Sequence, residues 1–196
     1  MITVVDVETS WQVTDTGGYD PSPYHPDNIL VSVGINDEYY FTNHSERIDN
    51  GCYHKIQSIL DKTTLLVGHN IKFDLMWLIE AGFKYTGKVY DTMLGEYILN
   101  RGIRKSLTLE MSCRRRRIGS KDNRIKEFTD RGIPFQNIPA NVVEEYGRMD
   151  VQITRDLFNS QMADFRMPKN KHLLMTAKMM NEFLIVLADM EANGIN

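Results

Sequence analysis

Two acidic residues lie at the end of an apolar, β-branched segment near the start of the chain. Asp6 and Glu8 stand two residues apart in VVDVETS. In a β-strand, residues two apart point to the same face of the sheet, so the two carboxylates would lie side by side. Adjacent carboxylates repel each other, and burying either one without a partner is costly. The spacing therefore predicts a nearby group that neutralises both charges.

A third acidic residue, Asp150, falls on an otherwise apolar face of a predicted helix, where an acid needs a partner. Its apolar neighbours recur at three- and four-residue spacing and are Val142, Val143, Tyr146, Ile153 and Leu157. Asp74, in HNIKFD, lies in the first turn of another predicted helix, where it could simply complement the helix dipole. A divalent cation would account for all four acids together, and carboxylate ligands favour Mg²⁺ or Mn²⁺.

The composition is that of a globular protein with one good core. The chain has 196 residues, of which 42% are apolar and 25% charged. Two cysteines, Cys52 and Cys113, form no CxxC motif, which favours a reduced intracellular compartment over a zinc site or a disulfide framework. No apolar run of about 18 residues predicts a membrane span, and the N-terminus lacks a secretory pattern.

Charge is distributed unevenly, although the net charge is only −3. Residues 1–50 carry nine acidic side chains and one basic side chain, Arg47. Residues 101–126 carry ten basic side chains against two acidic ones, Glu110 and Asp122. An acidic pole beside a basic segment suits a metal site next to a polyanion. The alternative for the basic run Arg114–Arg117 is an ordinary solvated surface.

Alternating and periodic apolar patterns predict an α/β protein with a mixed sheet. Residues 10–28 hold three prolines and two glycines and are expected to form a long loop, and residues 118–136 are expected to be irregular. Strands are expected at residues 2–8, 28–35, 38–44, 63–68 and 88–91, and helices at residues 47–62, 70–82, 91–100, 106–117, 140–165 and 172–194. Asn70 and Asp91 are expected to be helix N-caps.

The acidic motifs resemble a known family. VVDVETS, VGHNIKFD and YGRMD resemble the three motifs of the DEDD exonuclease superfamily, and Tyr146, four residues before Asp150, resembles its DEDDy branch. VYDTMLGEYILN and MEANGI resemble segments of family A DNA polymerases. The resemblance implies a proofreading 3′→5′ exonuclease domain with a ribonuclease H-like fold, a mixed five-stranded sheet flanked by helices. It implies an exonuclease domain at residues 1–166 and a helix at residues 167–196 that leads into a polymerase domain.

The resemblance also implies the catalytic roles. One metal ion, Mg²⁺ or Mn²⁺, would be bound by Asp6, Glu8 and Asp150, and a second would lie between Asp6 and Asp74, with the two ions about 3.5–4 Å apart. Tyr146 would orient the attacking water, because a phenol with a pKa of about 10 is a poor base near neutrality.

Seven further residues are predicted to bind the substrate. Four of them also have a structural alternative: strand-end packing for Thr9, loop packing for Trp11, core packing for Phe73 and helix capping for Asn70. In the resemblance, Arg104 corresponds to a phosphate-contacting basic residue of the family, although the two sequences differ in length at this point. The full set is Thr9, Trp11, His69, Asn70, Lys72, Phe73 and Arg104.

The expected substrate is the 3′ end of single-stranded DNA, and the expected partner is the polymerase domain of the same longer chain. We expect a monomer in the cytoplasm, which would be the host cytoplasm for a phage-like polymerase, the origin that an N-terminal exonuclease favours. Two alternatives stay open: a ribonuclease D-like exoribonuclease, and a catalytically silent domain that binds nucleic acid or acts as a scaffold.

Overall fold

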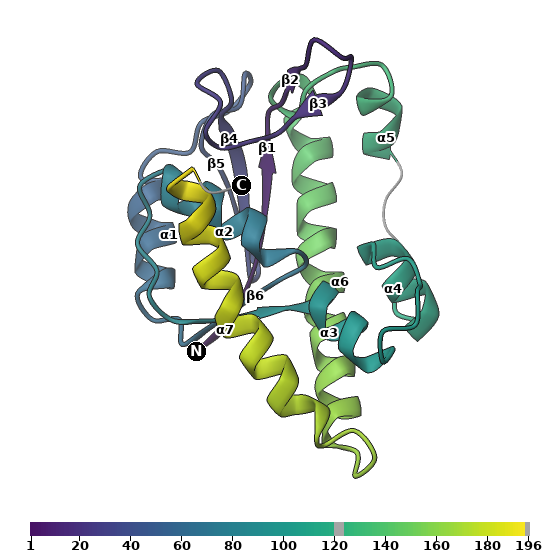
Figure 1. Ribbon diagram of the computed structural model, residues 1–196. Coiled ribbons are helices and arrows are strands. Elements are labelled where there is room, and N and C mark those ends of the chain that lie inside the picture. Colours follow the sequence, from purple (N-terminus) through teal and green to yellow (C-terminus); the bar gives the residue numbers. More distant parts are fainter. Residues whose placement is uncertain (120–123, 195–196) are drawn as a thin grey trace.

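A mixed five-stranded sheet forms the centre of the protein, as predicted (Figure 1). The computed structural model describes residues 1–119 and 124–194. The central strand β1 is antiparallel to β4 and parallel to β6. In spatial order the strands are β5 (Glu38–Phe41), β4 (Leu30–Ile35), β1 (Ile2–Thr9), β6 (Leu65–Gly68) and β7 (Lys88–Asp91).

Helices cover both faces of this sheet (Figure 1). Helices α1 and α2 pack on one face, α3 and α6 pack on the other, and α7 contributes Ala188 to the first cluster and Ala177 to the second. The helices are α1 (Cys52–Leu60), α2 (Ile71–Glu80), α3 (Thr92–Leu99), α4 (Leu109–Arg116), α5 (Arg124–Thr129), α6 (Ala140–Arg166) and α7 (Leu173–Ala192), with a 3-10 turn η1 (Phe135–Asn137) before α6. None of the helices within the described ranges is long and apolar enough to cross a membrane.

Strand β1 divides its side chains between the two faces. Val5 and Val7 are buried against α1 and α2, whereas Val4 belongs to the cluster beneath α6. Because side chains alternate along a strand, Asp6 and Glu8 share the face of Val4 and point toward α6. The apolar residues of β1 thus fix which way its acids point.

Two glycines let α6 lie close to the sheet. A Cβ at Gly34, opposite Asp6 in the β1–β4 ladder, would come within 2.8 Å of the Val151 side chain. A Cβ at Gly147 would come within 2.4 Å of the Tyr39 ring. Both approaches are shorter than real Cβ contacts, so a larger residue would force the facing side chain or α6 itself to shift.

Two regions predicted to be irregular contain regular structure. Residues 10–28 include a small hairpin of β2 (Gln12–Val13) and β3 (Tyr19–Asp20), and the stretch after α4 includes α5 and η1. Prolines and glycines predicted a loop in both places. The elements formed are six residues long at most, too short for periodicity to reveal. Lys121 and Asp122, counted in the basic segment, lie outside the described residues.

The basic run is neither a plain solvated surface nor wholly open to a polyanion. Arg115 and Arg116 both pair with Glu96 of α3, whose side chain is only 3% exposed. Arg116 also pairs with Asp164 of α6 at 2.7 Å. These pairs tie α4 to α3 and α6. Arg114 and Arg117, in contrast, are exposed.

Candidate active site

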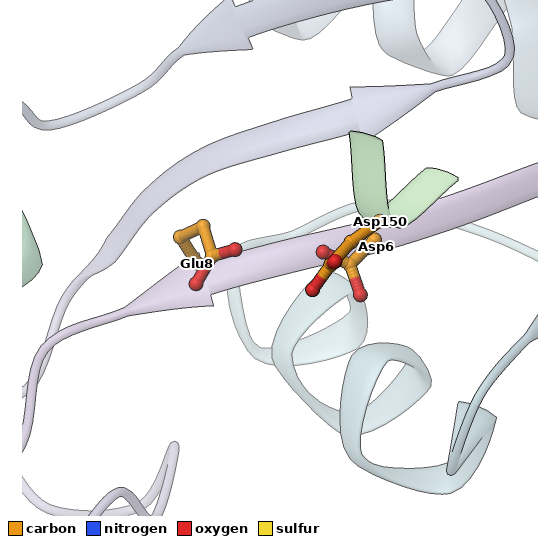
Figure 2. A group of neighbouring side chains, drawn as sticks. All are labelled: Asp6, Glu8 and Asp150. Atoms are coloured by element: carbon orange, nitrogen blue, oxygen red, sulfur yellow. The ribbon is translucent and has the colours of Figure 1, made fainter. Parts of the chain in front are cut away.

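Three acids from distant parts of the chain converge beside β1, as the sequence predicted. Asp6 and Glu8 on β1 and Asp150 on α6 each offer a carboxylate oxygen, and these oxygens lie within 4.8 Å of one another. Figure 2 shows Asp6 and Glu8 along the strand and Asp150 reaching it from the helix. Glu8 is 8% exposed and Asp150 is 3% exposed. This concentration of negative charge suits a hard cation.

Asp74 joins the site through the backbone of β1. It lies in the first turn of α2, and its Oδ1 accepts a hydrogen bond of 3.0 Å from the backbone N–H of Val7, between the two strand acids. Burial, and then the charge of Asp6, raise the pKa of the Asp74 carboxyl well above its usual range. A cation beside Asp6 would lower that pKa again, because positive charge stabilises the ionised form.

Tyr146 lies one helical turn before Asp150. Burial raises the pKa of its phenol far above the usual value, and the charges of Glu8, Asp150 and Asp6 raise it further. The phenol also makes a side-chain hydrogen bond with Asp150. At neutral pH the hydroxyl therefore keeps its proton, which suits a hydrogen-bonding group and not a base.

The Asp91 side chain makes hydrogen bonds at the start of α3 and, through the backbone of Asn70, at the start of α2. Asp91 caps α3, because its Oδ1 accepts hydrogen bonds from the backbone N–H groups of Met93 at 2.8 Å and Leu94 at 3.4 Å. The same oxygen accepts from the backbone N–H of Asn70 at 3.0 Å. The predicted side-chain cap by Asn70 is wrong, because this residue takes a left-handed conformation with φ 65° and its side chain makes no cap hydrogen bond. Its side chain is exposed and available for other contacts.

His69 forms part of a wall beside the carboxylates. Its Nδ1 lies 2.9 Å from Thr92 Oγ1 and its Nε2 lies 2.9 Å from the carbonyl of Leu107. The ring thereby joins the end of β6 to the segment that precedes α4. A hollow of about 470 Å³ runs along this wall and is lined by Asp6, His69, Met93, Leu107, Thr108, Leu109 and Asp150.

The other predicted substrate residues differ in how open they are. Thr9 is buried at 7% exposure at the end of β1. Trp11 is partly buried, and its ring packs edge to face on Tyr19 and Phe135. Phe73 packs against the core cluster under α2, in agreement with its structural alternative.

Two predicted basic contacts occupy different surroundings. Lys72 pairs with Glu191 and so links α2 to α7. Arg104 is exposed in the segment between α3 and α4, beside a hollow lined by Tyr97 and Leu107. Of these two basic residues, only Arg104 is exposed to solvent.

The sequence interpretation missed several residues that line the site. Met93, Leu107 and Thr108 border the hollow, and Phe135 packs 6.1 Å from Tyr146, measured between ring centroids. Phe135 lies in the stretch expected to be irregular, so no local pattern marked it. Thr108 had a visible signal as the N-cap of α4, which places it at the start of a helix.

Comparisons with known proteins identify the family of this chain. The family model described as 3′-5′ exonuclease, of the DNA polymerase A type, matches residues 14–163. The chain is similar to DNA polymerase I of Borreliella burgdorferi, at 26% identity over 141 residues. The aligned part is 72% of this chain and 15% of that relative.

Solved structures share the fold over nearly the whole chain. Brucella melitensis NrnC with bound Mg²⁺ matches with a TM-score of 0.66 and 16% identity, covering 98% of this chain and 86% of that one. The POL domain of Pol1 from M. smegmatis, in complex with DNA primer-template and dNTP, matches with a TM-score of 0.63 and 15% identity, covering 96% of this chain and 28% of that one. The mixed sheet flanked by helices is therefore ribonuclease H-like, and the chain belongs to the 3′-5′ exonuclease family of the DNA polymerase A type.

Proposed function

We propose that this domain removes nucleotides from the 3′ end of single-stranded DNA and serves as the proofreading exonuclease of a family A DNA polymerase. The observation that carries the proposal is the convergence of Asp6, Glu8 and Asp150, three carboxylates from two elements, at one end of β1. The match to the exonuclease family gives the reaction class and its direction.

The donor set fits divalent metal ions. The converging groups offer only carboxylate oxygens, which are the ligands that Mg²⁺ and Mn²⁺ prefer. In this proposal Asp6, Glu8 and Asp150 would hold one ion, and Asp6 and Asp74 would hold a second. When bound, such a pair of ions supplies a nucleophilic water at neutral pH and stabilises the leaving 3′ oxygen.

The remaining groups act on the substrate and on the water. Tyr146, placed four residues before Asp150 as in the DEDDy branch, orients the attacking water through its protonated hydroxyl. Asn70, exposed at the start of α2, and His69, in the wall beside the carboxylates, contact the terminal nucleotide. Arg104 contacts a phosphate. Thr9, Trp11 and Lys72 complete the proposed substrate set, with Trp11 beside the terminal base, whereas Phe73 packs against the core.

The polymerase context rests on similarity and on one surface. A polymerase I relative and a polymerase structure both contain a region similar to this chain. Residues 167–196 would lead into the polymerase domain. The outer side of α7 carries exposed apolar side chains, which an adjoining domain would cover: Leu174, Met175, Met179, Phe183, Val186 and Met190.

An exoribonuclease of the ribonuclease D type is the second candidate. The likeness to NrnC extends over 86% of that chain, whereas the polymerase match covers only 28% of its chain, so a nuclease without a polymerase domain stays open. The fold alone does not determine whether the substrate is DNA or RNA, because one fold can carry different activities. A matched pair of substrates with deoxyribose or ribose decides between the two candidates.

The experiment is a cleavage assay with 5′-labelled single-stranded DNA and RNA of one sequence, in Mg²⁺, Mn²⁺ or EDTA. We expect metal-dependent shortening from the 3′ end, faster on DNA, and no shortening with Asp6→Ala. Faster cleavage of RNA would favour the ribonuclease D alternative. Metal-dependent stabilisation without cleavage, also in the longer polymerase chain, would indicate a silent domain.

A further inference from the structure

A continuous row of aromatic rings connects residues 10–28, here called the arm, to Tyr146. The Trp11 ring lies 5.6 Å from Tyr19 and 5.8 Å from Phe135, in edge-to-face geometry. The Phe135 ring lies 6.1 Å from Tyr146, tilted by 48°. These centroid separations are those of favourable aromatic pairs. Phe135 is therefore the side chain through which the arm touches the proposed water-orienting tyrosine.

The backbone that carries Phe135 is held by side chains from another part of the chain. Both the backbone N–H of Ser45, at 3.0 Å, and its hydroxyl, at 2.6 Å, donate to the carbonyl of Gln136. The buried ring of His44 lies 2.8 Å from the carbonyl of Ile138. These contacts fix η1 on the segment that follows β5, so Phe135 has a fixed place beside α6.

The arm is held as firmly at its own base. The buried Asn28 amide donates at 2.9 Å to the carbonyls of Asp20 and of Ser22. The Ser10 hydroxyl accepts from the backbone N–H of Ile29 at 2.7 Å, and the Trp77 indole donates to the carbonyl of Pro21 at 3.2 Å. Trp11, directly after Ser10, is thus set in place on the far side of Phe135.

We infer that Phe135, supported by Trp11, is a positioning residue for Tyr146. The inference rests on the proposed function, because it assigns the row of rings a part in orienting the attacking water. The Tyr146 hydroxyl is directed to Asp150, while its ring packs in the cluster that contains Phe135. Removing Phe135 opens space beside the ring, and the phenol can then turn away from the carboxylates.

The test is a double-mutant cycle on DNA cleavage with the variants Phe135→Ala, Tyr146→Phe and their combination. We expect Phe135→Ala to lower kcat about ten- to a hundredfold and to leave KM nearly unchanged, the scale of loss that a misplaced group produces. In the Tyr146→Phe background the same change should cost less than about threefold, because no hydroxyl remains to be positioned. Phe135→Leu should lower kcat less than Phe135→Ala does.

Phe128→Ala serves as the matched control, because Phe128 packs in the same cluster and lies outside the row of rings. It should lower thermal stability as Phe135→Ala does and keep kcat. If the fold-losses in kcat of Phe135→Ala and Tyr146→Phe simply multiply in the double variant, the inference is overturned. A rise in KM equal to the fall in kcat would also overturn it, because it would indicate a substrate contact.

A readout that needs no activity separates this inference from the proposed function. The ring-proton NMR signals of Tyr146, assigned by their loss in Tyr146→Phe, should shift in Phe135→Leu and stay in place in Phe128→Ala. Unshifted signals would overturn the positioning. An inactive wild type would overturn the proposed function, and with it the catalytic part of the inference, whereas the signals would still report the ring contact.

Discussion

Two clusters of charged side chains at α6 arrange their buried carboxylates differently. At one, Glu96 of α3 meets the guanidinium groups of Arg115 and Arg116. At the other, the carboxylates of Asp6, Glu8 and Asp150 meet one another. The first cluster brings its own positive charge and joins three helices. The second concentrates negative charge in one place, which is the arrangement expected of a site that receives a cation.

The difference gives a criterion for reading buried acids. A carboxylate paired with arginine stabilises the fold mainly because breaking the pair would leave an uncompensated charge. Carboxylates that converge concentrate negative charge in one place, and a cation that binds the native state there stabilises it. Neutralising an acid should therefore mainly reduce cation binding and catalysis at the converging carboxylates. At the arginine cluster it should mainly reduce the free energy of unfolding.

The largest expected effect is on catalysis at the converging acids. Asp150→Asn should lower kcat about a thousandfold or more, since bound metal ions are worth several kcal/mol of transition-state stabilisation. Saturating Mg²⁺ should raise the melting temperature of the wild type more than that of the variant, because the variant lacks one of the converging carboxylates. Cleavage of labelled DNA and thermal denaturation measure the two quantities. Equal stabilisation of the wild type and the variant by Mg²⁺ would contradict the contrast.

The opposite pattern is expected at the arginine cluster. Glu96→Gln should lower the free energy of unfolding by about 3 kcal/mol, because Arg115 and Arg116 then lose their shared anion. The cleavage rate of the folded protein should stay within about threefold of the wild type. Urea denaturation measures the stability, and Glu110→Gln on the exposed side of α4 is the control. Equal stability of Glu96→Gln and the control would refute the structural role.

A smaller effect is expected where α6 approaches the sheet. Gly147→Ala places a methyl group against the Tyr39 ring and should lower the free energy of unfolding by about 1–3 kcal/mol, despite the better helix propensity of alanine. Cleavage should fall too, because Asp150 is carried on the displaced helix. Gly119→Ala, where an added Cβ would meet Ile153 at an ordinary 3.4 Å, is the control. Full activity in Gly147→Ala would argue against the close approach.

The pH dependence of metal-free stability should report Asp74. Burial and the charge of Asp6 raise the pKa of Asp74 in the folded state above its unfolded value of about 3.9. The native state therefore binds this proton more tightly, and its contribution to stability is full below the unfolded pKa and lost as pH rises through the folded pKa.

Asp74→Asn removes this titration. In EDTA the melting temperature of the variant should rise relative to that of the wild type as pH increases from about 4. Saturating Mg²⁺ should stabilise the wild type more than the variant. A difference in melting temperature that is the same at every pH would rule out the shifted carboxyl.

The smallest expected effect concerns Lys72, which was predicted to bind substrate and pairs with Glu191. If the pair only links α2 to α7, Lys72→Met and Glu191→Gln should each cost less than about 1 kcal/mol of stability and leave KM unchanged, as for partly exposed ion pairs. A KM that rises in Lys72→Met alone would instead identify a substrate contact. Steady-state kinetics on the two variants separates the outcomes.

The parts of the fold and site that were predictable are those with a strong local signal. Alternation along β1 predicted the shared face of Asp6 and Glu8, and the apolar stripe of α6 predicted a buried Asp150. Both predictions depend on periodicity within one element. The positions of the five central strands along the chain followed from the same patterns, whereas their order in the sheet came only from the structure.

The parts that were not predictable depend on contacts between distant residues. No sequence pattern near Arg115 or Arg116 predicts that they pair with Glu96, which lies about twenty residues earlier on another helix. Asn70 has the residue type of a cap, yet Asp91 from the next strand takes its backbone N–H and the side chain is left exposed. Phe135 gains its place through residues distant in sequence, with Trp11 and Tyr146 flanking its ring and Ser45 holding its backbone segment.

The most direct test of the central claim is a calorimetric titration of Mn²⁺ into the metal-free protein, compared with Asp150→Asn and Glu96→Gln. We predict saturable binding to the wild type, retained binding in Glu96→Gln at a temperature where that variant is folded, and loss of binding in Asp150→Asn. Binding of Mn²⁺ to Asp150→Asn as tight as to the wild type would contradict the assignment of the converging carboxylates as the metal site.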